Sequence, residues 1–134
     1  NCLRQIETEV RAAVAAAGQP PEQLRRMFRA SVESSLRLFF QDRKLYDIAA
    51  SAATERWPAV LAYELAMGAL LQDILQQGRK TGDFERKTPL DETASAIFLV
   101  MRPYVNPLLL QHSVDSSETA VLQLSSLVLR SLSP

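Results

Sequence analysis

Apolar residues recur at three- and four-residue steps along most of the chain, which is the spacing that one face of an α-helix requires. In the first segment Ile6, Val10 and Val14 follow this spacing, and Gly18 then ends it. The few Gly and Pro residues stand between long stretches rich in Ala, Leu, Arg, Glu and Gln, which favour helix. We therefore expect an all-α protein without strands.

The breaks in the pattern predict a bundle of about six helices with orthogonal or antiparallel packing. The expected helices cover residues 3–17, 20–40, 42–53, 57–77, 88–110 and 115–132. Asp42 and Thr88 are expected to cap their helices, Gly78 to stop the fourth one in a left-handed conformation, and Pro103 and Pro107 to kink the fifth. Residues 78–90 carry six charges and predict an exposed loop that Phe84 anchors to the body.

The last two helices are apolar around more of their circumference than one core contact needs. Residues 91–134 contain 6 charged residues in 44, against 24 in the first 90. This excess predicts burial on two sides, most simply against a second copy of the chain through a two-fold interface. The residues expected in that interface are Ile97, Val105, Leu109, Val121, Leu124, Val128 and Leu132.

Three motifs occur in order within the stretch from residue 53 to residue 110. Trp57-Pro58 opens a long helix, the helix ends in ILQQGRKTGDF at residues 74–84, and TPLDETASAIF follows at residues 88–98. In order and spacing this set resembles the carboxy-terminal regulatory domain of TetR-type transcriptional repressors. The resemblance implies one ligand-binding and dimerisation domain over residues 1–134, with dimerisation helices at 88–134.

In that family an amino-terminal helix-turn-helix module binds operator DNA. No stretch of this chain has the sequence pattern of a helix-turn-helix module. Residues 1–17 resemble the remainder of the helix that connects this module to the regulatory domain. The resemblance therefore implies a truncated repressor that reaches DNA only through the absent module. Lys plus Arg (15) equals Asp plus Glu (15), so the chain has no basic excess of its own for binding nucleic acid.

The resemblance also implies a central cavity for a small effector, enclosed by the second, fourth and fifth helices. Aromatic and Met residues on or beside these helices are the expected ligand contacts: Phe28, Trp57, Tyr63, Met67, Phe98, Met101 and Tyr104. The two tyrosines would supply polar contacts and the methionines adaptable walls. Ser95, Arg102 and Asn106 share one helix face, which we interpret as a solvated or dimer-rim stripe.

Residues that carry catalysis or bind metal are scarce. A single Cys2 and a single His112 exclude a disulfide framework and a metal cluster built on them, and no cofactor motif is present. The acids of the 78–90 loop are best explained as solvated, so we expect no catalytic residues and no enzyme. The apolar run from Ala94 to Met101 is far shorter than a bilayer requires, which predicts a cytoplasmic protein without a membrane contact.

The expected function is therefore that of a homodimeric effector-binding domain of a TetR-like repressor. A small apolar or amphipathic ligand would change the spacing of the two DNA-binding modules allosterically. Two alternatives remain open from the sequence. One is a stand-alone dimeric helical carrier of small molecules, and the other is a module whose apolar helices dock a different protein.

Overall fold

Seven α-helices and one short 3₁₀ turn make up residues 2–134, the part of the chain that the computed structural model describes. This part contains no strand, so the all-α prediction is confirmed. The elements are α1 (Cys2–Ala15), α2 (Pro20–Phe40), α3 (Arg43–Glu55), α4 (Pro58–Thr81), α5 (Leu90–Val105), α6 (Pro107–Leu110), η1 (Val114–Ser116) and α7 (Ser117–Ser131).

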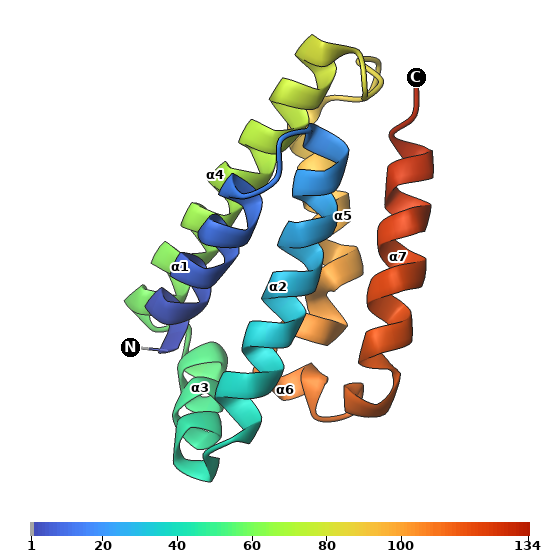
Figure 1. Cartoon of the computed structure of the whole chain (residues 1–134). Coiled ribbons are helices and arrows are strands. Elements are labelled where there is room, and N and C mark those ends of the chain that lie inside the picture. The colour runs from blue at the N-terminus through green and yellow to red at the C-terminus, as the bar shows by residue number, and fades with distance from the viewer. Residues whose placement is uncertain (1) are drawn as a thin grey trace.

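The five long helices lie roughly side by side, with α1, α4 and α7 pointing one way and α2 and α5 the other (Figure 1). Helix α2 is central, because it packs against α1, α4, α5 and α7. The shorter helices α3 and α6 lie together at one end of the bundle (Figure 1). The loop between α4 and α5 lies at the other end, near the carboxyl terminus (Figure 1).

Local sequence signals set most helix starts. Pro residues occupy the first turns of α2, α4 and α6, where their missing N–H groups would have no helical partner. The Asp42 side chain accepts a hydrogen bond from the Lys44 N–H at 2.8 Å, so Asp42 caps α3 as its position in the sequence predicts. The predicted bounds of α2, residues 20–40, agree with the structure.

The prediction that Gly78 stops α4 is wrong. The helix continues to Thr81, and Gly82 is the residue with left-handed geometry, at φ +83°. Gly78 is buried inside the helix, where the ring of Phe84 occupies the place of a side chain. The glycine serves close packing rather than a turn, which the sequence motif alone does not distinguish.

The predicted fifth helix, residues 88–110, is two helices in the structure. Helix α5 ends at Val105, and Asn106 adopts an extended backbone before Pro107 opens α6. A residue that precedes Pro is sterically pushed out of the helical region, which explains the break. Pro103 remains inside α5. Thr88 does not cap α5, because Pro89 occupies that position without a side-chain hydrogen bond.

Helix α4 is long and apolar enough to span a membrane by length and composition alone. Such a helix is weak evidence for a membrane span, because a core helix of a helical bundle passes the same test. In this fold α4 packs against α1, α2, α3 and α5. Its Leu71, Ile74 and Leu75 side chains lie in the hydrophobic core, whereas Leu61 and Leu65 are exposed at 41% and 76%.

Candidate functional site

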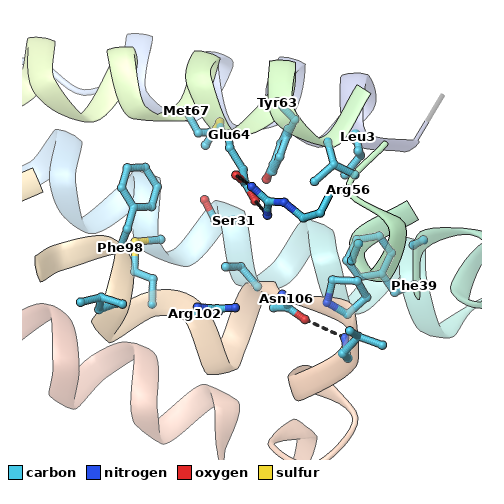
Figure 2. Close-up of a pocket in the computed structure, with 18 of the residues that line it drawn as sticks. Leu3, Ser31, Phe39, Arg56, Tyr63, Glu64, Met67, Phe98, Arg102 and Asn106 are labelled. Atoms are coloured by element: carbon cyan, nitrogen blue, oxygen red, sulfur yellow. Dashed lines mark hydrogen bonds and ion pairs between the residues drawn. The ribbon is translucent and has the colours of Figure 1, made fainter. Parts of the chain in front are cut away.

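A cavity of about 580 Å³ opens between the helices, in the half of the bundle next to α3 and α6 (Figure 2). Its lining comes from α2, α3, α4, α5 and α6, with Leu3 contributed by α1. This volume falls in the range of small-molecule sites in proteins, about 300–1,000 Å³. The break at Asn106 and the turn into α6 place Pro107 and Leu108 in the lining as well.

Apolar side chains cover most of the cavity wall. Met67 of α4 and Met101 of α5 are buried and line it, and Phe98 of α5 lies across the cavity from α4 (Figure 2). Thioether side chains adapt their shape to different ligands, because they have three rotatable bonds and no branch. The wall therefore suits an apolar or aromatic body of variable shape.

A buried hydroxyl in the cavity wall lacks a hydrogen-bond partner. Ser31 of α2 is 2% exposed and lines the cavity, and its Oγ makes no hydrogen bond within the described chain. A hydroxyl in a helix commonly donates to the carbonyl four residues earlier, but Ser31 does not do so. A buried unpaired hydroxyl costs about 1–3 kcal/mol, so a ligand atom that pairs with it gains that much.

An ion pair between α4 and the end of α3 borders the cavity. The guanidinium of Arg56 donates to both carboxylate oxygens of Glu64, at 3.1 and 3.3 Å (Figure 2). Arg56 ends α3 with φ +53°, and it is the one non-glycine residue of 2–134 with a positive φ. This left-handed conformation directs the chain from α3 into α4 and places Arg56 in the cavity lining.

Three further polar side chains complete the lining. Burial raises the pKa of the Tyr63 phenol well above its ordinary value, so the hydroxyl stays protonated. Arg102 and Asn106 lie four residues apart on or just after α5 and contribute to the same wall (Figure 2). The Asn106 Oδ1 accepts from the Leu108 N–H at 2.9 Å, which leaves its NH₂ group as the available donor.

The structure brings together four of the seven side chains that the sequence assigns to the ligand site. Tyr63, Met67, Phe98 and Met101 line the cavity. Phe28 is fully buried in the core, and Trp57 lies outside the lining with its indole N–H donating to Glu55. Tyr104 also lies outside it.

Sequence reasoning misses the polar part of the site. The helical pattern places Ser31 on the core face of its helix, and it gives no reason to single out Arg56 or Glu64. The shared face of Ser95, Arg102 and Asn106 is evident from the sequence, but as a solvated stripe. All three residues line the cavity. A polar stripe that borders an apolar one on a helix next to a cavity is the signal that could find them.

Four of the seven residues expected in a dimer interface are covered within the single chain. Ile97, Val121, Val128 and Leu132 are 4–8% exposed and pack in the bundle. Leu109 is 40% exposed, and Val105 and Leu124 are partly buried. The large apolar side chains that α7 leaves exposed are Leu122 at 57% and Leu127 at 54%.

Residues 2–134 contain no group of three or more His, Cys, Asp or Glu side chains that could hold a metal ion. His112 is exposed and lies 3.4 Å from the side-chain nitrogen of its neighbour Gln111. The charged loop between α4 and α5 is held by its own contacts. The Glu85 carboxylate accepts hydrogen bonds from the Lys87 and Thr88 N–H groups, and Phe84 is buried.

Comparison with known proteins gives one match. The family described as "Tetracyclin repressor-like, C-terminal domain" matches residues 20–123. No curated protein and no solved structure matches the chain. The matched range begins at the first residue of α2 and ends within α7, so it includes every helix that lines the cavity except α1.

Proposed function

Because this chain belongs to the family of tetracycline-repressor-like C-terminal domains, we propose that it senses a small amphipathic effector for a transcription regulator. Domains of this family serve generally in ligand binding and dimerisation. The cavity of about 580 Å³ between the helices is the observation that carries the proposal. Its wall is largely apolar with a few polar groups, as in sites that bind and orient small organic molecules.

The contact between the cavity and α1 suggests how a bound ligand acts on the rest of a regulator. Leu3 of α1 lines the cavity, and α1 packs along α2 and α4. A ligand that pushes on Leu3 or on the α4 wall favours one position of α1 over another. We propose that α1 relays this change towards a DNA-binding module and that the regulator is a cytoplasmic repressor, not an enzyme.

A binding experiment with a filled cavity tests the sensor role. Ala53 of α3 lines the cavity, whereas Ala62 of α4 is exposed and outside the lining. A panel of small amphipathic compounds is screened by thermal shift on the wild type, Ala53→Trp and Ala62→Trp. We expect compounds that raise the melting temperature of the wild type and of Ala62→Trp but not of Ala53→Trp. Equal shifts in all three proteins would place binding outside the cavity.

We propose that two copies pair through the outer surfaces of α5 and α7. In Figure 1 α7 lies on the side of the bundle away from α4, and α5, which packs against α4, lies next to α7. Helix α7 buries one face on α2 and α5, and Leu122 and Leu127 remain exposed on it. Of the residues expected in the interface, Leu109, Val105 and Leu124 are the ones that the bundle leaves at least partly accessible.

Sedimentation of charged variants tests the pairing. The change Leu122→Asp with Leu127→Asp introduces two unpaired charges on the proposed interface, so we expect monomers of about half the wild-type mass. Leu65→Asp on α4 is the control, because Leu65 is 76% exposed and lies away from α7. It should sediment as the wild type does. A wild type that is monomeric at all concentrations would overturn the proposed pairing.

A further inference from the structure

Several of the polar groups that face the cavity can donate a hydrogen bond to a ligand. The Ser31 hydroxyl is buried and unpaired within residues 2–134, and the Tyr63 hydroxyl stays protonated. The Asn106 NH₂ group is available because its oxygen is engaged with Leu108. Such a set matches a ligand head group that carries only acceptor oxygens.

The charges of the lining are not balanced. Arg56 is paired with Glu64 through both carboxylate oxygens. Arg102 also lines the cavity, and its guanidinium makes no ion pair or hydrogen bond with any side chain in residues 2–134. The lining therefore holds two arginines and one glutamate, which leaves one cation without a partner in the described chain.

Arg102 lies between Phe98 and Asn106 along the wall that α5 provides, so an aromatic ring stands on one side of it and an amide donor on the other (Figure 2). A planar guanidinium binds a carboxylate through two parallel hydrogen bonds. A phosphate, with close to two negative charges, would meet only one unpaired cation here.

We propose that the effector is an amphipathic monocarboxylate, with its carboxylate on Arg102 and Asn106 and its apolar body against Met67, Phe98 and Met101. This proposal rests on the proposed sensor function and names the chemical class of the ligand. The match of one unpaired cation to one carboxylate sets the charge of the ligand.

A head-group series separates this proposal from the sensor function itself. Decanoate, decanol and decylammonium share one apolar body and differ in charge, and 2-naphthoate, 2-naphthol and 2-naphthylmethylammonium do the same for an aromatic body. Binding of each compound to the purified chain is measured by calorimetry and thermal shift. We expect the carboxylate of at least one series to bind about tenfold or more tightly than its neutral and cationic partners.

Matched arginine variants identify the group that binds the carboxylate. Arg102→Gln should weaken binding of the carboxylate about tenfold or more and bring it to the level of the alcohol, whereas Arg102→Lys should retain part of the preference. Arg130→Gln removes an exposed cation on α7, outside the cavity, and should leave binding unchanged. Circular dichroism checks that each variant is folded. Because Arg102 is exposed, the preference should also decrease as salt is added.

The outcomes distinguish the two proposals. If the alcohol or the ammonium compound binds as tightly as the carboxylate, or if Arg102→Gln leaves the preference intact, the monocarboxylate proposal is wrong and the sensor function stands. If no compound of either series binds, the monocarboxylate proposal is overturned, and the sensor function is decided separately by the thermal-shift panel on the wild type, Ala53→Trp and Ala62→Trp. If Arg130→Gln weakens binding of the carboxylate as much as Arg102→Gln does, the carboxylate binds at the surface and the proposal is also overturned.

Discussion

The ring of Phe84 fills the space that a side chain at position 78 would need. Gly78 is buried within α4, and the Phe84 N–H donates to the Gly78 carbonyl oxygen at 3.0 Å. A Cβ at Gly78 would overlap the ring atoms Cγ, Cδ2 and Cε2 of Phe84. This contact holds the loop after α4 against the bundle and keeps Phe84 only 3% exposed.

Gly78→Ala is therefore expected to destabilise the protein. Alanine gains about 1 kcal/mol of helix propensity over glycine, but the overlap displaces a buried aromatic ring and the loop attached to it. We expect a net loss of about 2 kcal/mol in the free energy of unfolding, measured by urea denaturation. Gly18→Ala is the control, because a Cβ at Gly18 would meet no atom within 4 Å and the residue has no positive φ. An equal effect of both changes would contradict the packing explanation.

The left-handed backbone conformation of Arg56 is expected to destabilise the protein, and glycine at this position should relieve the strain. The residue has φ +53°, a conformation that costs a non-glycine residue about 1–2 kcal/mol. Arg56→Gly and Arg56→Ala both remove the exposed ion pair to Glu64, but only glycine removes the strain. We expect Arg56→Gly to unfold at higher temperature than Arg56→Ala, by about 1 kcal/mol in stability. Equal stability of the two variants would mean that the left-handed conformation stores no strain.

Ser35→Ala should raise the stability of the protein. Ser35 of α2 is 1% exposed, and its Oγ has no hydrogen-bond partner in the described chain. Removing this hydroxyl removes an unsatisfied buried group, so we expect a gain of about 1 kcal/mol. Ser125→Ala is the matched control on α7, because Ser125 is also buried but its Oγ donates to the Val121 carbonyl. Chemical denaturation should show a gain for Ser35→Ala that exceeds any gain for Ser125→Ala.

Glu85, in the loop between α4 and α5, makes the stability of the protein depend on pH. Hydrogen bonds from the Thr88 side chain and backbone and from the Lys87 N–H lower the pKa of Glu85 below its ordinary value of 4.5. A carboxyl whose pKa is depressed by folding stabilises the folded state above its unfolded pKa and loses that contribution as pH falls through the folded value. Glu85→Gln should therefore melt below the wild type at pH 7, and the gap should narrow below pH 4.5. A gap that is constant from pH 7 to pH 3 would contradict this assignment.

The helices and their order could be predicted from the sequence because their signals are local. The periodicity of Ile6, Val10 and Val14, the Pro residues at helix starts and the cap at Asp42 act within one or two helical turns. The same is true of the motif from residue 74 to residue 98, which resembles the family that matches the chain. The predicted end of α4 is wrong because the motif has two glycines, Gly78 and Gly82, and the pattern alone does not distinguish the one that packs against Phe84 from the one with φ +83°.

The candidate site could be predicted only in part. Periodicity shows which helix face is apolar, and only the family resemblance predicts a cavity there; Met67, Phe98 and Met101 do line one. It does not show whether an apolar face closes on a neighbouring helix or leaves a space, and Phe28 belongs to a face that closes. It also treats Ser31 and Arg102 as unrelated, although they line one cavity from two helices.

By itself, the sequence determined that this protein is a helical bundle, where most of its helices begin, and which family it resembles, because these follow from the spacing of residues near one another in the chain. The tertiary structure decided which apolar surfaces are core, which are exposed, and where the cavity lies. These depend on how helices distant in sequence pack together. Within residues 2–134, that packing alone leaves Ser31 without a hydrogen-bond partner and Arg102 without a counter-charge beside the same space.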